Sequence, residues 1–136
     1  MGGLVLLAGS AAGARSATPS DYPSCGTYWN RNAPVSLREQ RVNRCILRAA
    51  RDGRRARAVA ALTTVEGDPI VQYVFIRAKR DVLVLIDTTR DAFGPRGWVR
   101  LRCTRLLASG DRLGWTGCRQ TGSGKPPWLV PFRAVG

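Results

Sequence analysis

The sequence of 136 residues contains no histidine. Without an imidazole, the chain cannot build the Ser-His-Asp or Cys-His arrangements that activate the nucleophile of many hydrolases. It also contains no C-x-x-C pair, and the spacing of its four cysteines matches no zinc module. We therefore expect no metal site, and nothing in the sequence indicates a cofactor.

Acidic residues are scarce, with 9 Asp and Glu against 22 Lys and Arg, which gives a formal net charge of +13. The basic residues are almost all arginine, and Lys79 and Lys125 are the two lysines. Together with abundant alanine, glycine and valine, this composition is typical of a GC-rich coding bias. A charge of this size predicts non-specific attraction to nucleic acids or anionic surfaces, and we expect no specific nucleic-acid recognition.

Long hydrophobic runs are absent too. The apolar stretch at residues 4–12 is far shorter than the roughly 20 residues of a membrane-spanning helix, and an A-x-A pattern follows at 12–14. These features predict a secretory signal peptide at residues 1–14, although a disordered Ala/Gly-rich leader is the alternative. No basic segment precedes the stretch, so we expect the start codon to lie upstream. The mature chain would then be a single domain, 17–120, with a Pro/Gly-rich tail, 121–136.

An even number of cysteines in a small exported chain indicates two disulfides, for which three connectivities are open. We expect Cys25–Cys45 to tie an irregular N-terminal segment to a helix, and Cys103–Cys118 to cross-link the last hairpin. The second pair requires a bulge or a longer turn, because a four-residue hairpin loop would place Cys103 opposite Thr116.

One helix is well delimited by its end signals. Ser36 and Glu39 form a capping box at its start, and Gly53 is placed to end it. One face is apolar, with Val42, Cys45, Ile46 and Ala49. The other face carries a row of arginines at steps of three and four, namely Arg41, Arg44, Arg48, Arg51 and Arg55. This row is a candidate polyanion-binding face, but a solvated helix face is the interpretation that we favour.

After the helix, the pattern changes to strands. Five are expected, at residues 57–65, 70–77, 82–87, 98–107 and 112–118. Their short connections favour an antiparallel meander. The predicted fold class is therefore α+β, with one N-terminal helix packed on a four- to five-stranded antiparallel meander sheet and stabilised by disulfides.

Two turn motifs hold four of the nine acidic residues, at 64–69 (TVEGDP) and 87–94 (DTTRDAFG). Successive turns of a meander alternate between its two ends, so these two motifs should meet at the same end of the sheet. They define a candidate polar site, composed of Glu66, Asp68, Asp87, Asp91, Arg90 and Arg96. It could hold a cation or a basic group of a ligand. We favour turn chemistry, in which the carboxylates bind local backbone N–H groups.

The string T-x-E-G-D-P-I at 64–70, followed by Tyr73, by D-x-x-x-D-x-F-G at 87–94 and by Cys103, resembles a family of small uncharacterised exported bacterial proteins and lipoproteins. Cys25-Gly26 and the helical Cys45-Ile46-Leu47 fit the same pattern. The resemblance implies an extracytoplasmic α+β domain, but no assigned activity and no catalytic residue. The leader lacks the lipobox cysteine that lipid-anchored members carry.

These features predict a monomeric, non-enzymatic binding module, secreted or extracytoplasmic, whose partner is a cell-surface or extracellular protein or a polyanion. Two alternatives remain: an exported hydrolase that uses the acidic turn cluster, and a protein inhibitor that presents a rigid loop. A phosphate loop at 121–125 is excluded, because Pro126 occupies the position of the required Ser or Thr. An open cleft would favour the enzyme, a flat sheet edge the binder and a protruding rigid loop the inhibitor.

Overall fold

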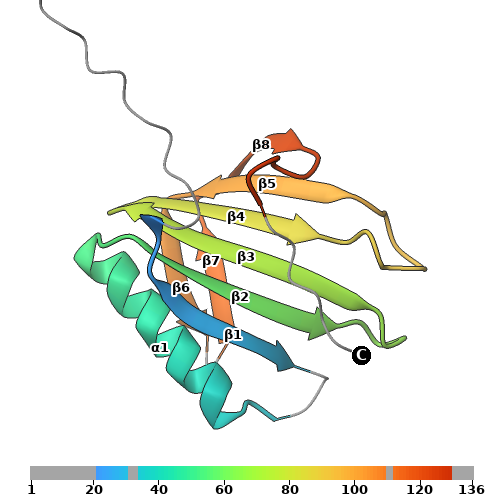
Figure 1. Cartoon of the computed structure of the whole chain (residues 1–136), viewed down its shortest axis with the longest axis horizontal. Helices are drawn as coiled ribbons and strands as arrows, with labels where there is room; N and C mark the ends of the chain where they lie inside the picture. The colour runs from blue at the N-terminus through green and yellow to red at the C-terminus, as the bar shows by residue number, and fades with distance from the viewer. Residues whose placement is uncertain (1–20, 31–33, 110–111, 130–136) are drawn as a thin grey trace, which may run out of the picture.

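The computed structural model describes residues 21–30, 34–109 and 112–129, so the expected signal peptide lies outside the described residues. The elements in chain order are β1 (Ser24–Asn30), α1 (Leu37–Asp52), β2 (Ala56–Thr63), β3 (Pro69–Ala78), β4 (Asp81–Asp87), β5 (Trp98–Cys103), β6 (Arg105–Ser109), β7 (Arg112–Thr116) and β8 (Arg119–Ser123). A six-stranded sheet has the order β1-β2-β3-β4-β5-β8, and β6 and β7 form a separate two-stranded sheet (Figure 1). The α+β class and the disulfides are confirmed.

The sheet is mixed, and the prediction of a purely antiparallel meander was wrong. β2 to β5 do pair antiparallel in sequence order. The segment before the helix, expected to be irregular, is instead the strand β1, which pairs parallel to β2. The helix α1 is therefore the crossover of a β-α-β unit and not the first element of the fold. A register shift between Ser24 and Gly26, with Gly26 at φ 117°, interrupts the alternation that would have revealed this strand.

The helix follows its sequence signals closely. Its N-cap Ser36 accepts a hydrogen bond from the Glu39 N–H at 3.1 Å, and Gly53 ends the helix at φ 69°. The Glu39 carboxylate was expected to reach back to the Ser36 N–H. It is only 3% exposed, and it accepts from the Asn30 side-chain amide on β1 at 3.3 Å. Glu39 thereby joins the start of the helix to the edge strand β1.

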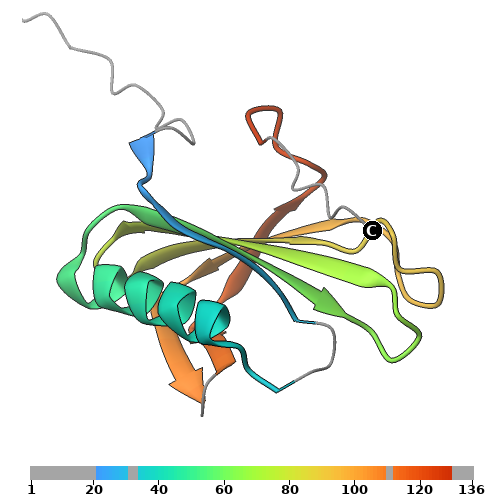
Figure 2. The same ribbon diagram turned by 60° about the horizontal axis from the view of Figure 1, so that its bottom comes forward.

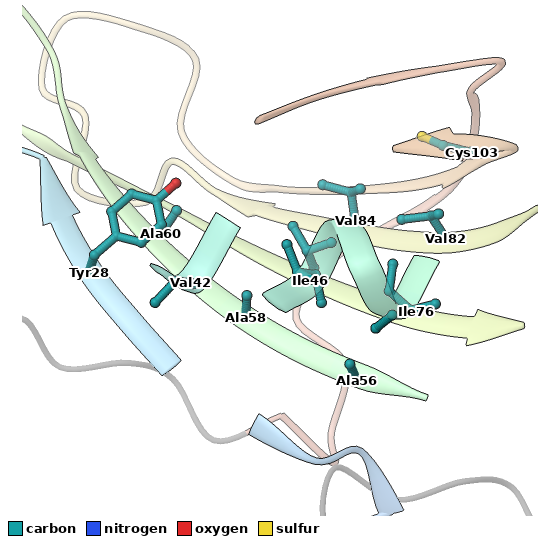
Figure 3. Packing of buried hydrophobic residues seen from close by; sticks show 12 residues of the cluster. Tyr28, Val42, Ile46, Ala56, Ala58, Ala60, Ile76, Val82, Val84 and Cys103 are labelled. Atoms are coloured by element: carbon teal, nitrogen blue, oxygen red, sulfur yellow. The ribbon is translucent and has the colours of Figure 1, made fainter. Parts of the chain in front are cut away.

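Two hydrophobic clusters pack on the two faces of the sheet. On one face α1 and the β6–β7 hairpin lie side by side, as Figure 2 shows. Ile46 of α1 packs there against Ala58 of β2 and Val84 of β4 (Figure 3). The small alanines of β2 leave room for the helix to approach the sheet. The second cluster, on the opposite face, centres on Tyr73, Phe75 and Leu85.

The expected strand 98–107 breaks at Thr104, where the chain leaves the main sheet to form the β6–β7 hairpin. It returns as β8, with Arg102 opposite Arg119. The next pair in this register is Cys103 and Cys118, which are disulfide-bonded. The second disulfide therefore closes the base of the excursion and needs no bulge within the hairpin. The first disulfide joins Cys25 and Cys45, also as expected.

The strand β8 continues to Ser123 and pairs with β5, across the expected boundary between domain and tail at residue 121. Beyond β8, Pro126 and Leu129 are buried, and the Trp128 ring meets Phe75 edge-on at 5.5 Å. This part of the tail therefore covers the second face of the sheet, and residues 130–136 lie outside the described residues. In the described chain, no helix is long and apolar enough to span a membrane.

Candidate functional site

The two turn motifs lie side by side at one end of the sheet. The β2–β3 turn (residues 64–68) and the β4–β5 loop (residues 88–97) protrude from the same end of the sheet in both views (Figures 1 and 2). The Ala92 N–H in the longer loop donates to Asp68 Oδ2 in the shorter one at 2.9 Å. We call these two segments together the two-loop end. Their proximity agrees with the alternation of turns in a meander.

The shorter loop is fixed by its own backbone and by Thr64. The Thr64 N–H donates to the Asp68 carbonyl at 2.9 Å, and the Thr64 hydroxyl accepts from the Asp68 N–H at 3.1 Å. Gly67 has φ 96°, a conformation that side chains rarely adopt. These bonds orient the Asp68 carboxylate toward the neighbouring loop. Asp68 therefore joins the two loops.

Asp87, the last residue of β4, and Asp91 of the longer loop also bind local donors. Asp87 Oδ1 accepts from the Thr89 N–H at 2.9 Å and from the Thr89 hydroxyl at 2.6 Å. Asp91 Oδ1 accepts from the N–H groups of Phe93 and Gly94, at 3.0 and 2.9 Å. A side chain at position 94 would overlap the Asp91 carboxylate, so a larger residue there would displace that carboxylate. The three aspartates of the candidate polar site thus bind hydrogen-bond donors of the loops themselves.

The charged residues around them do not neutralise the aspartates. Arg96 donates through Nε to the Asp91 backbone carbonyl at 2.9 Å. Arg90 and Glu66 are exposed, and no ion pair of the described chain includes either of them. Among the described residues, no group of three potential metal ligands occurs. The six residues of the candidate site share one end of the sheet, where the aspartates bind the loops themselves.

Two features of this end were missed in the sequence. Thr88 closes the longer loop, since its hydroxyl donates to the Pro95 carbonyl at 2.8 Å and its N–H donates to the Gly97 carbonyl at 2.9 Å. Phe93 and Val65, one on each loop, are 77% and 95% exposed. An apolar aromatic residue in a segment rich in Asp, Thr, Gly and Pro was the available signal, because such a residue has no strand face to occupy.

The arginine row of α1 lies on the solvent face, and all five of its residues are exposed. Arg55 lies beyond the end of the helix, with its guanidinium 5.8 Å from the centre of the Tyr22 ring, so it does not continue the row. Arg51 pairs with Asp52 at 3.4 Å. The remaining three surround a shallow depression beside the Cys45 disulfide, namely Arg41, Arg44 and Arg48. A solvated face is the interpretation that this geometry favours.

Comparisons of the chain with family models, with curated proteins and with solved structures gave no significant match. The resemblance to a family of exported bacterial proteins therefore stays a prediction.

Proposed function

We propose that this chain is an extracytoplasmic, non-enzymatic module that binds a partner protein through the two-loop end. The observation that carries the proposal is the 77% exposure of Phe93 on a loop whose backbone is fixed on every side. Asp68 and Asp91 bind the N–H groups around Phe93, and Thr88 and Arg96 bind the carbonyl groups that flank it.

A fixed loop with an exposed aromatic side chain is well suited to recognition. Its backbone is already ordered, so binding costs little additional conformational entropy. Burial of a phenylalanine side chain contributes about 1.5–3 kcal/mol, and aromatic residues are frequent at the energetic centre of protein interfaces. Val65 on the adjoining loop is exposed as well, and Arg90 and Arg96 are exposed residues of the loop that carries Phe93. The partner surface that fits is an apolar pocket with carboxylates at its rim.

The hydrolase alternative has less support. A pair of catalytic carboxylates must face the same bond of the substrate and exchange protons with it. Asp68, Asp87 and Asp91 instead accept hydrogen bonds from the loops that they hold in place. The inhibitor alternative is a special case of the present proposal, because an inhibitor also binds its partner through a rigid protruding loop.

Export is part of the same proposal. Two disulfides link cysteines of the domain, and such bonds persist in oxidising compartments outside the cytoplasm. A partner protein is therefore expected among extracellular or cell-surface proteins.

The proposal is tested with the folded protein and two variants as baits for the extracellular and envelope proteins of the producing cells. Phe93→Ala removes the exposed aromatic side chain at the two-loop end. Leu37→Ala is the matched control, because Leu37 is 73% exposed at the start of α1. We expect one protein to be retained by the wild type and by Leu37→Ala, and lost with Phe93→Ala.

Calorimetry with that purified partner should then show a loss of about 1–3 kcal/mol for Phe93→Ala alone. Equal binding by all three baits would contradict the proposal. If the retained partner is a hydrolase that loses activity in the complex, the module is an inhibitor.

A further inference from the structure

A basic groove lies at the end of the sheet opposite the two-loop end. It has a volume of about 320 Å³ and runs between the last turns of α1, the β3–β4 turn and the start of β6. Its apolar lining residues are Leu47, Ala50, Ala78, Val82 and Leu106. Its walls carry four cations, Arg51, Lys79, Arg80 and Arg105.

The groove continues into a second depression of about 430 Å³ toward β8. Both are lined by Arg80 and Thr104, so the two depressions adjoin at the β3–β4 turn, and we call them together the track. The second depression adds Arg102 and Arg119. Its single carboxylate, Asp81, is already bound by Arg102 at 3.1 Å and by Arg77 at 3.7 Å. The track as a whole is therefore strongly cationic.

Most of these cations have no counter-charge. Among the described residues, no ion pair includes Lys79, Arg80, Arg105 or Arg119. Arg51 has Asp52 as its partner, which Arg54 shares. Like charges gathered around a concave surface repel one another and raise the local concentration of anions. An anionic ligand would relieve this repulsion.

Arg80 occupies an unfavourable backbone conformation at the centre of the track. Lys79 and Arg80 form the two-residue connection between the paired Ala78 and Asp81, and Arg80 has φ 60°. Among the described residues, it is the single non-glycine residue with positive φ. An arginine is strained there relative to glycine. What the arginine adds is a guanidinium where the two depressions meet.

We propose that this track binds a linear polyanion whose repeating anionic groups are phosphates and which carries no bases. Guanidinium groups bind phosphate oxygens in a bidentate manner, and two linked depressions suit a chain better than a single small ion. No aromatic residue lines either depression. Single-stranded nucleic acid is disfavoured for that reason, because its binding sites gain much of their affinity from bases stacked on aromatic side chains.

The test measures binding of inorganic polyphosphate of defined length, and of single-stranded DNA with the same number of phosphates, over a series of salt concentrations. The informative variant is Arg80→Gly combined with Arg105→Ala, since glycine relieves the positive φ and the domain should stay folded. Its control is Arg41→Ala combined with Arg44→Ala, which removes the same charge from the exposed face of α1. Phe93→Ala is included to separate this site from the two-loop end.

We expect tighter binding of polyphosphate than of DNA, with an affinity that falls linearly with salt on logarithmic axes. The groove variant should lose at least about tenfold in affinity, with a salt slope shallower by roughly one to two units, and the control and Phe93→Ala about threefold or less. Equal losses of affinity in the groove and control variants would overturn the proposal, because net charge and not the groove would then determine binding. Tighter binding of DNA, or no binding of polyphosphate at physiological salt, would also overturn the proposal.

Discussion

Replacement of Asp68 by alanine separates turn chemistry from a ligand site at the two-loop end. The change removes the acceptor of the Ala92 N–H, and with it the bond that joins the two loops at 2.9 Å. A hydrogen bond to a charged group contributes about 1.5–3 kcal/mol, and Asp68 is half-buried, so the lower part of this range applies. We expect a loss of about 1–2 kcal/mol in the free energy of unfolding.

The assay is thermal unfolding together with urea titration of the same samples. For a domain of this size, 1 kcal/mol corresponds to a shift of about 4 °C in Tm, so Asp68→Ala should melt about 4–8 °C lower. Glu66→Ala is the matched control, because it removes one carboxylate from the same turn and Glu66 is exposed. Its Tm should move by about 2 °C or less. Asp68→Asn retains a neutral acceptor and should lie between the two.

The opposite sign would refute this reasoning. Carboxylates held close together for a ligand repel one another in its absence, so removal of one would stabilise the free protein. A Tm that stays constant or rises with Asp68→Ala would mean that the Asp68–Ala92 bond contributes nothing. The aspartates would then have to be reconsidered as a binding site.

Three further predictions concern the interior. Burial, followed by the nearby Glu39 carboxylate, raises the pKa of Tyr28 from 10.0 to about 12, so the folded state holds this proton more tightly than the unfolded chain. The free energy of unfolding, measured by chemical denaturation, should hold its full value below pH 10 and fall by about 2–3 kcal/mol between pH 10 and 12. Tyr28→Phe should remove this fall. Ile46→Ala should cost about 2–5 kcal/mol in the same assay, because Ile46 is fully buried between the helix and the sheet. Replacement of both Cys103 and Cys118 by alanine should cost about 3 kcal/mol, and recovery of free thiols from the unreduced wild type would contradict the bond itself.

Elements with local signals could be predicted from the sequence. The helix was predictable because Ser36 and Gly53 act within one turn of its ends, through hydrogen bonds that short-range sequence determines. The three central strands were predictable because buried residues such as Val74 and Val84 recur along them with β-branched neighbours. Their short connections then determined their order in the sheet.

The remaining elements depend on contacts distant in sequence. β1 pairs with β2 across the whole helix, and no turn residue marks such a parallel partner. The end of β8 falls within the expected Pro/Gly-rich tail, 121–136. Its side chains are mostly exposed, and backbone pairing with β5 holds it in the sheet. The disulfide pairing was predicted correctly. The expectation that Cys103 would face Thr116, and that the second pair needs a bulge, arose from treating 98–107 as one strand. The break at Thr104 removes that requirement.

At the candidate site, the sequence predicted where the acidic side chains lie but not what each carboxylate binds. Turn alternation placed Asp68 and Asp91 at one end of the sheet, and that inference needed strand order alone. Whether a carboxylate faces a ligand or a backbone N–H depends on distances of a few tenths of an ångström, which sequence does not encode locally. The exposure of Phe93 likewise follows from the conformation of the whole loop.

The unequal distribution of acids explains why the two ends of this sheet differ in chemistry. Glu66, Asp68, Asp87 and Asp91 all lie at the two-loop end, where aspartates satisfy backbone donors in the turns. In a chain with 9 acids and 22 basic residues, acids placed there are absent from the rest of the surface. The β3–β4 turn at the opposite end retains Asp81 alone, shared by two arginines. Asp52, at the end of α1, is likewise shared by Arg51 and Arg54. Cations therefore outnumber acids at this end, and variants of Asp68 and of Arg80 should act on separate properties of the molecule.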